Sequence, residues 1–271
     1  MNGFLERMAA SSRARAEGLR AARSGPALRA RALASAPPPR LRRRGSFDLI
    51  AEFKRRSPSS GHLGDGVVAA RATAYAEAGA AAVSVLTEPA QFGGGLEDLG
   101  SAAGALAPLG VPVMRKDFIV DPCQVSETRA AGGGGVILIL RILSPGQLAE
   151  LMDCARELAL FVLLEAFDET DLERAGLALA GGQPAGAPPV LVGVNCRDLA
   201  SLAVRPMRLV ELAGRMPAGA IKVAESGIET PSDCVGLARA GFDFALVGTA
   251  LMRCPDPGAL LGRMLAAGRS A

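Results

Sequence analysis

The most constraining feature of this sequence is a rhythm that begins after Gly45. Short apolar runs rich in β-forming residues alternate there with longer Ala-, Leu- and Glu-rich stretches. Such alternation is typical of strands that are each followed by a helix, and it predicts a parallel sheet. Eight strands are enough to close that sheet into a (β/α)8 TIM barrel. We expect them near residues 47–53, 81–86, 112–116, 135–140, 160–165, 189–195, 220–225 and 243–248.

Three of the expected helices carry a start signal, in which a capping residue precedes a proline and an acceptor side chain follows at the third helical position. The signals are Asp121-Pro122 with Gln124, Ser144-Pro145 with Gln147, and Thr230-Pro231 with Asp233. An open doubly wound sheet is the alternative architecture. The first expected strand lacks the G-x-G-x-x-G turn of a dinucleotide-binding version, so we favour the closed barrel.

Length and composition suit a single large barrel. The 271 residues are 49% hydrophobic and 21% charged, and we assign residues 46–271 to one catalytic domain. No apolar run reaches the roughly 18 residues of a membrane span, so we expect no contact with a membrane. The five cysteines are scattered without a C-x-x-C pair. This indicates a reduced, cytoplasmic protein without a cysteine metal site.

The first 45 residues differ in charge from the rest. They hold eleven arginines and two glutamates, a net charge of +9, whereas the 19 basic and 25 acidic residues that follow give −6. A transit peptide or a nucleic-acid-binding arm is an alternative, but an apolar signal core and interleaved aromatic residues are missing. We interpret residues 1–45 as a helical extension that packs on the barrel, because Phe4, Leu5 and Met8 have helical spacing and a proline run begins at Pro37.

Polar side chains follow nearly every expected strand at its C-terminal edge. They are Glu52, Lys54, Thr87, Glu88, Lys116, Arg141, Glu165, Asn195, Arg197, Glu225, Ser226 and Thr249. Because that face of a TIM barrel carries the active site, the pattern predicts a ring of side chains around one pocket. Glu52 and Lys54 alternate along one strand and therefore share a face. A surface ion pair is the alternative interpretation of these two residues.

Glycines near the end of the chain indicate a phosphate site. Ser226-Gly227 follows the seventh expected strand and Gly248-Thr249 follows the eighth. These two loops commonly hold a phosphate in barrel enzymes, although tight turns alone could also require the glycines. His62 is the only histidine. A histidine triad or metal cage is therefore not expected, and proton transfer falls to lysine and glutamate side chains.

Six motifs, in order along the chain, resemble indole-3-glycerol phosphate synthases of tryptophan biosynthesis. They are residues 50–59, 84–88 with 92–94, 115–122, 194–199, 225–228 and 246–252. Any one of them is a weak signal, whereas six in the same order are a strong one. The resemblance implies a carboxy-lyase that converts 1-(2-carboxyphenylamino)-1-deoxyribulose 5-phosphate to indole-3-glycerol phosphate, carbon dioxide and water. It implies ring closure, decarboxylation and dehydration without a metal or an organic cofactor.

The same resemblance implies roles for individual residues. Lys116 would be the general acid that protonates the substrate carbonyl, and Glu165 would stabilise the developing positive charge. Lys54 would protonate the departing hydroxyl, with Glu52 as its partner base. The implied catalytic set is Glu52, Lys54, Lys116, Glu165, Asn195 and Ser226. The implied substrate- and phosphate-binding set is Ser57, Phe118, Arg197, Glu225, Gly227, Leu246, Gly248 and Thr249.

The chain departs from the family pattern at three places. Cys196 replaces a common second asparagine, and Phe167 lies where a histidine is frequent; neither position is assigned to catalysis. Four glycines from Gly132 to Gly135 precede the fourth expected strand, and we expect them to loosen that connection.

Two other functions remain open at this stage. A different phosphosugar barrel enzyme could use Lys54 or Lys116 as an acid or a Schiff-base former. A non-catalytic phosphate-binding barrel could have kept the fold and lost turnover. For any of these we expect a small phosphosugar as the partner, no nucleic acid, and a monomer or weak homodimer.

Overall fold

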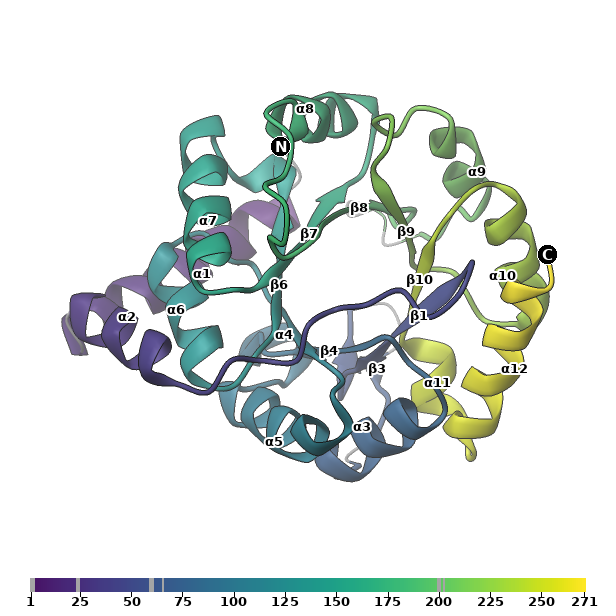
Figure 1. The fold of residues 1–271 in the computed structure, drawn as a ribbon, viewed down its shortest axis with the longest axis horizontal. Helices are drawn as coiled ribbons and strands as arrows, with labels where there is room; N and C mark the ends of the chain where they lie inside the picture. Colours follow the sequence, from purple (N-terminus) through teal and green to yellow (C-terminus); the bar gives the residue numbers. More distant parts are fainter. Residues whose placement is uncertain (1–2, 23–24, 59–60, 65, 199–200, 202) are drawn as a thin grey trace.

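The computed structural model of the protein describes residues 3–22, 25–58, 61–64, 66–198, 201 and 203–271. Ser59 and Leu199, which end two of the motifs above, lie outside the described residues. Eight parallel strands close a barrel in the order β1-β10-β9-β8-β7-β6-β5-β4 (Figure 1). Their bounds are β1 Asp48–Phe53, β4 Ala82–Leu86, β5 Val113–Lys116, β6 Gly135–Ile139, β7 Phe161–Ala166, β8 Val190–Asn195, β9 Ile221–Glu225 and β10 Phe244–Val247.

The predicted barrel is confirmed, and the open sheet is wrong. Every predicted strand lies within about one residue of the observed one, because strands covered on both faces read as continuous apolar runs. The barrel closes where β1 pairs with both β4 and β10. A short hairpin that the sequence did not predict, β2 Arg56–Ser57 with β3 Gly61–His62, stands in the loop after β1. His62, in β3, is exposed.

Helices surround the sheet (Figure 1). The outer ring is α3 Val68–Glu77, α5 Leu96–Leu106, α6 Pro122–Ala130, α7 Pro145–Glu157, α8 Glu169–Leu179, α9 Met207–Ala213, α10 Pro231–Arg239 and α12 Pro257–Arg269. Shorter pieces follow three strands: α4 Pro89–Phe92, the 3-10 turn η2 Leu140–Ile142 and α11 Thr249–Arg253. A second 3-10 turn, η1 Ala107–Leu109, follows α5. Within the described residues, no helix is long and apolar enough to cross a membrane.

Two of the three predicted helix starts form complete capping boxes. Ser144 and Gln147 bond reciprocally at the start of α7, and Thr230 and Asp233 do so at α10. Asp121 caps α6 as predicted, but its carboxylate accepts from Cys123. The Gln124 side chain is not part of a box. It accepts from the Val120 amide and donates to the Ser12 hydroxyl of the N-terminal helix, so tertiary contact has replaced the local bond.

The four glycines before β6 do not loosen the chain; they allow close packing. A Cβ on Gly133 would lie 2.6 Å from Thr128, and one on Gly134 would lie 2.9 Å from Pro112. A Cβ on Gly135 would lie 2.4 Å from the Phe161 ring, which fills the barrel interior. The expectation of a loose connection is therefore wrong, because here a missing side chain makes room for a neighbour.

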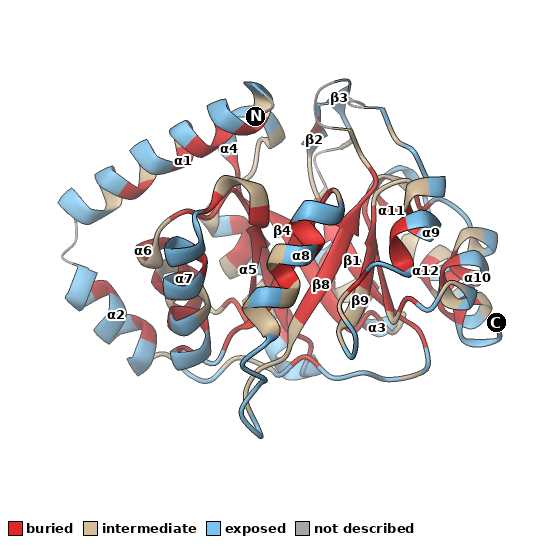
Figure 2. Cartoon of the chain, turned by 90° about the horizontal axis from the view of Figure 1, so that it is seen from above, coloured by how far each residue is buried: buried red, intermediate tan, exposed pale blue. Residues whose placement is uncertain are grey.

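The N-terminal extension is helical, as predicted, and consists of α1 Gly3–Ala22 and α2 Gly25–Ala34. In Figure 2 the start of α1 lies at the same end of the molecule as the β2–β3 hairpin, while α2 packs beside α6. Arginines of the extension meet acids of the barrel in four ion pairs: Arg15–Asp117, Arg20–Asp121, Arg29–Glu157 and Arg43–Asp243. The opposite charges of the two parts therefore attach the extension to the barrel.

Candidate active site

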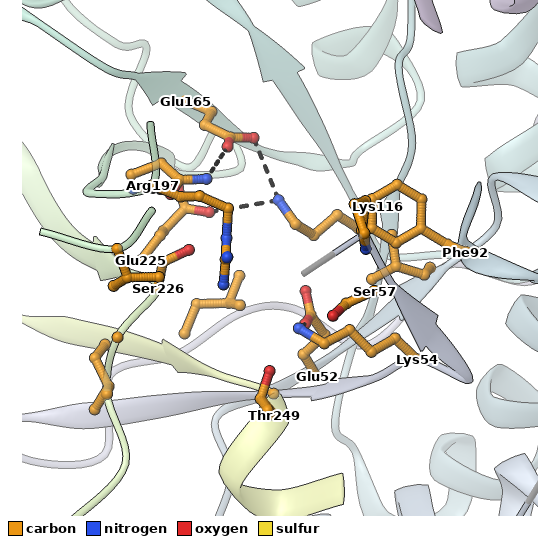
Figure 3. A pocket seen from close by; sticks show the side chains of 18 of the residues that line it. Glu52, Lys54, Ser57, Phe92, Lys116, Glu165, Arg197, Glu225, Ser226 and Thr249 are labelled. Carbon is orange, nitrogen blue, oxygen red and sulfur yellow. Dashed lines mark hydrogen bonds and ion pairs between the residues drawn. The ribbon is translucent and has the colours of Figure 1, made fainter. Parts of the chain in front are cut away.

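A cavity of about 670 Å³ opens at the C-terminal ends of the strands. All fourteen residues that the sequence assigned to catalysis or binding line it, so these residues share one pocket. Figure 3 shows, with labels, ten of the residues that line the cavity. Period-two alternation explains why they meet: Lys116, Glu165 and Glu225 point inward two residues beyond the apolar Met114, Leu163 and Val223 of the same strands.

Three strand-end residues of the predicted ring do not line the cavity. Thr87 donates to the Asp117 carboxylate outside the barrel interior. Glu88 caps α4 by accepting three backbone N–H groups. Arg141 pairs with Asp168 and Asp171 in the loop and helix that follow β7. Their side chains point away from the cavity, toward the surrounding helices. The sequence could not predict this direction, because the end of each strand was not known to the residue.

Lys116 lies between two buried carboxylates. Its Nζ is 3.2 Å from Glu165 Oε2 and 3.5 Å from Glu225 Oε2. Asn195 Nδ2 donates to the other Glu165 oxygen at 2.5 Å, which fixes the orientation of that carboxylate. Burial alone would lower the pKa of Lys116, but the charges of Glu165, Glu225 and Glu52 outweigh it and raise that pKa above its ordinary value. The ammonium is therefore protonated at neutral pH.

Glu225 is the least satisfied polar group of the site. Its side chain is 1% exposed, and neither carboxylate oxygen has a hydrogen-bond partner. Gly193 makes room for it, since a Cβ there would lie 2.2 Å from Glu225 Oε1. Burial first, and then the charge of Glu165, raise the pKa of Glu225 to about 8. The site therefore contains a buried carboxyl group that faces Lys116 and takes up a proton more readily than an ordinary glutamate.

A second acid–base pair lies across the cavity. Lys54 Nζ is 2.5 Å from Glu52 Oε1, and both side chains are largely buried at the end of β1. The alternative of a surface ion pair is therefore wrong. Gly248 borders this pair, because a Cβ at that position would lie 2.2 Å from Glu52 Oε1 and 2.9 Å from Lys54 Nζ. The glycine thus gives space to the pair as well as to any ligand at the end of β10.

The loops after β9 and β10 form the side of the cavity where the sequence predicted a phosphate. Ser226 and Gly227 both have left-handed backbone conformations, with φ of 72° and 69°. A positive φ at a serine is uncommon and costs free energy, which is a frequent property of functional turns. Thr249 begins α11 at the end of the next loop, and Ser57 of β2 lies on the same side as Lys54 (Figure 3).

An apolar wall closes another side of the cavity, and the sequence did not predict most of it. Phe118 was expected there, and its ring contacts Phe4 at a centroid distance of 6.2 Å and Phe92 at 6.4 Å. The other members are Leu5, Ile139 and Phe167. Helical spacing predicted that Phe4 and Leu5 pack on the barrel, but it carries no signal for which face they cover.

Both departures from the family pattern border the site. The Cys196 thiol donates to the Ser226 carbonyl at 3.4 Å, behind one of the predicted catalytic residues. Burial raises the pKa of that thiol to about 11, so it is neutral. Phe167 lines the cavity and stacks against the Arg141 guanidinium, 4.5 Å from the ring centroid. A substitution at Phe167 would therefore change the cavity wall, and one at Cys196 would change the support behind Ser226.

The fold and the cavity define a class: a TIM barrel whose C-terminal cavity is lined by paired lysine and glutamate side chains. Comparison with known proteins narrows it, because the family model of indole-3-glycerol phosphate synthase matches residues 9–264. Similar chains include the indole-3-glycerol phosphate synthases of Nocardioides sp. (46% identical, covering 84% of this chain and 83% of that one) and Mycobacterium avium (38%, 88% and 85%). The chain belongs to the indole-3-glycerol phosphate synthase family.

The family predicted from the six motifs is thus confirmed, and with it a carboxy-lyase of tryptophan biosynthesis. Solved structures support only the fold. The 3-hexulose-6-phosphate synthase of Salmonella typhimurium superposes with a TM-score of 0.60 at 14% identity, covering 82% of this chain and 98% of that chain. Thiamine phosphate pyrophosphorylase of Pyrococcus furiosus gives 0.58 at 15%, covering 84% and 98%.

Proposed function

We propose that Lys116 is the general acid that starts the reaction of this family in the cavity. The substrate would bind with its ketone oxygen near Nζ, and its carboxyphenyl ring carbon would attack the carbonyl carbon. Lys116 gives a proton to the oxygen as the new carbon–carbon bond forms. A buried ammonium held by two carboxylates is a positioned donor, and this geometry is the observation that carries the proposal.

Glu165 would stabilise the positive charge that develops on the substrate during attack. Its carboxylate is 3% exposed and oriented by Asn195, so it acts in a site of low dielectric where a fixed charge is most effective. The bond to the carboxylate group then breaks, carbon dioxide leaves, and the electron pair of that bond restores the aromatic ring. Asn195 contributes orientation of Glu165 and of the substrate.

Lys54 and Glu52 would serve the dehydration. The hydroxyl produced by ring closure leaves as water with a proton from Lys54, and the neighbouring carbon loses a proton to Glu52. Their 2.5 Å contact keeps donor and acceptor on one side of the ring. Lys54 would also pair with the substrate carboxylate before decarboxylation. Two separate lysine–glutamate pairs thus match the two steps that transfer protons, ring closure and dehydration.

The binding set would hold the rest of the substrate. Phe118 and Leu246 would contact apolar parts, and Arg197 and Glu225 would offer charge and hydrogen bonds. Phosphate binding is assigned to the loops after β9 and β10 together with the β2 hydroxyl, all of which line the cavity. That set is Ser57, Gly227, Gly248 and Thr249, with Ser226 beside the substrate.

The wider setting is proposed on the same basis. Residues 46–271 would form the catalytic domain and residues 1–45 an extension, in a monomer or weak homodimer that acts without a metal or organic cofactor. All five cysteines are free thiols, which supports a reducing, cytoplasmic location. Within the described residues, no three His, Cys, Asp or Glu side chains converge as a metal site requires. The cofactor-free reaction stays a prediction.

The test is turnover of 1-(2-carboxyphenylamino)-1-deoxyribulose 5-phosphate by wild type and Lys116→Met. The chain has no tryptophan and a single tyrosine, so the indole product fluoresces over a dark background. Wild type should form product and carbon dioxide in the presence of a chelator. Lys116→Met should lose about 10²–10⁴-fold in kcat. Activity that requires an added divalent ion, or a variant with near-wild-type kcat, would refute the proposal.

A further inference from the structure

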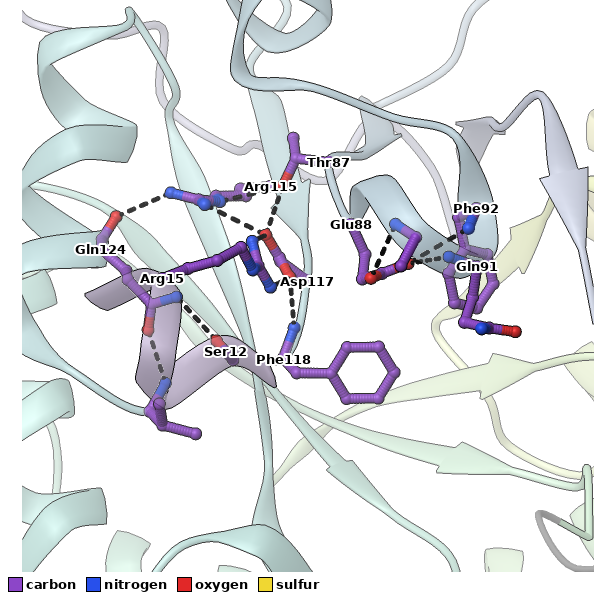
Figure 4. Close-up of polar contacts among 12 residues, drawn as sticks. Ser12, Arg15, Thr87, Glu88, Gln91, Phe92, Arg115, Asp117, Phe118 and Gln124 are labelled. Atoms are coloured by element: carbon purple, nitrogen blue, oxygen red, sulfur yellow. Dashed lines mark hydrogen bonds and ion pairs between the residues drawn. The ribbon is translucent and has the colours of Figure 1, made fainter. Parts of the chain in front are cut away.

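The carboxylate next to Lys116 in the sequence is the centre of a buried network outside the barrel interior. Asp117 is fully buried and accepts five hydrogen bonds (Figure 4). Arg15 of α1 donates two, at 2.9 and 2.7 Å, in a two-point contact. The others come from the Thr87 hydroxyl, the Arg115 guanidinium and the Phe118 amide, at 2.7, 3.0 and 2.8 Å.

This network surrounds the main chain from which Lys116 projects. The Thr87 amide donates to the Lys116 carbonyl at 3.1 Å, while the Thr87 hydroxyl binds Asp117. Arg115, on the other side of Lys116, also donates to Thr87 and to Glu127 of α6. Because neighbouring strand residues point to opposite faces, the outward pair Arg115 and Asp117 fixes the strand end that aims Lys116 inward.

The charges of the network are balanced only when α1 is in place. Burial alone would raise the pKa of Asp117, but the Arg15 hydrogen bonds and the Arg115 charge outweigh it and hold that pKa well below its usual range. Without Arg15, the buried Asp117 carboxylate would have Arg115 as its one cationic partner among the ion pairs of the described residues. Arg115 is also paired with Glu127. Loss of the Arg15 contact would therefore change the position of the Asp117 side chain and of the backbone of residues 116–118.

We infer that Arg15 is a positioning residue for catalysis: through its two-point contact with Asp117, the N-terminal helix aligns the Lys116 ammonium with Glu165 and Glu225. The inference rests on the proposed role of Lys116. Helix α1 would then contribute to the site in two ways, through the apolar wall and through Arg15. Phe4 and Leu5 contact the cavity directly, whereas Arg15 lies on the far side of the strand end and acts through the backbone.

The effect of removing Arg15 follows from geometry. A displacement of about 1 Å at a reacting group can lower the rate about 100-fold. Arg15→Met should therefore lower kcat by about 10- to 100-fold, with KM within about 3-fold of wild type because the phosphate loops are untouched. If Lys116 moves away from the two carboxylates, its pKa falls. The alkaline limb of the kcat profile should then appear at lower pH than in wild type.

Arg20→Met is the matched control. It removes the same charge from the same helix, but the partner of Arg20 is Asp121 at the start of α6 and the pair is exposed. Its kcat and KM should stay within about 2-fold of wild type, as for most exposed ion pairs. Arg15→Lys keeps the charge and loses the two-point geometry, so its kcat should lie between those of wild type and Arg15→Met.

The outcomes separate the possibilities. Equal effects of Arg15→Met and Arg20→Met, a rise in KM alone, or a fall in kcat without a shifted alkaline limb would each overturn the inference. If Arg15→Met is insoluble, soluble Arg15→Lys decides, and wild-type kcat with a wild-type pH profile overturns the inference. A fully active Lys116→Met would instead refute the proposed function and leave Arg15 to be explained by stability alone.

Discussion

The barrel interior has two ends built from the same strands and with opposite chemistry. Toward the N-terminal ends it is apolar, with Ile50, Met114, Leu163, Val223 and Leu246 in one cluster. Two residues further along each of these strands lie Glu52, Lys116, Glu165, Glu225 and Gly248. One step of the strand period therefore separates the core from the residues that we propose act in catalysis and binding.

The contrast teaches how one sheet carries both stability and reactivity. The apolar end contributes burial without polar groups to satisfy, whereas the charged end places three buried glutamates near two lysines. Such a cluster is costly to bury, and neither carboxylate oxygen of Glu225 has a hydrogen-bond partner. The apolar end stabilises the strands, and the same strands hold the side chains of the charged end at fixed distances.

The largest difference between the two ends should come from substitutions at Glu165 and Leu163, the two neighbouring inward positions on β7. Glu165→Gln keeps an acceptor for Asn195 and should lower kcat by about 10²–10⁴-fold while the free energy of unfolding changes by less than about 1.5 kcal/mol. Leu163→Ala leaves a cavity in the apolar layer and should lower the free energy of unfolding by about 2–5 kcal/mol. Its folded fraction should keep kcat within about 3-fold of wild type.

Denaturant unfolding and steady-state kinetics on both variants measure the difference. The comparison fails if Glu165→Gln loses as much stability as Leu163→Ala, because the charged layer would then support the fold. It also fails if Leu163→Ala loses as much kcat as Glu165→Gln at full folding, since the apolar layer would then take part in catalysis.

Much of this contrast could be predicted from the sequence because it is local. Apolar runs mark the strands, and the first polar residue after each run marks the mouth, so Lys116 and Glu165 were placed correctly. Where a strand end is followed by a turn, the same rule fails. Arg141 belongs to the 3-10 turn after β6, and its side chain turns outward to Asp171.

Contacts between distant segments could not be predicted. Arg15 and Asp117 are 102 residues apart, and nothing in either sequence neighbourhood identifies the other. Helical spacing predicted that the extension packs on the barrel, but only the structure places Phe4 in the cavity wall. The space that Gly248 leaves for Glu52 is likewise a property of two strands brought together by barrel closure.

A substitution at Gly248 should have an intermediate effect on kcat, because this residue borders both the Glu52–Lys54 pair and the proposed phosphate site. In Gly248→Ala the added Cβ would displace Glu52 and Lys54, so kcat should fall by about 10- to 100-fold in addition to any rise in KM. Gly262→Ala in α12 is the control, because a Cβ there meets no atom within 4 Å. Steady-state kinetics decide: a rise in KM with unchanged kcat would restrict Gly248 to phosphate binding.

A further difference between the two ends should be seen in how stability depends on pH. The pKa of Glu225 is raised to about 8 in the folded protein and is about 4.5 when the chain is unfolded. Between these values the unfolded chain releases a proton that the folded protein keeps. Glu225 therefore lowers the free energy of unfolding as pH rises from about 4.5 to about 8, and the loss is complete above the folded pKa.

Glu225→Gln cannot ionise, so it should lack this slope. The stability of the variant relative to wild type, measured by denaturant unfolding, should increase from pH 5 to pH 8 and then level off. Glu157→Gln is the control, because that carboxylate is half exposed on α7. A relative stability that stays constant across this range would mean that Glu225 is ionised in the folded protein. The charged end would then hold three carboxylates against two lysines, which would require the substrate site to be more acidic than proposed.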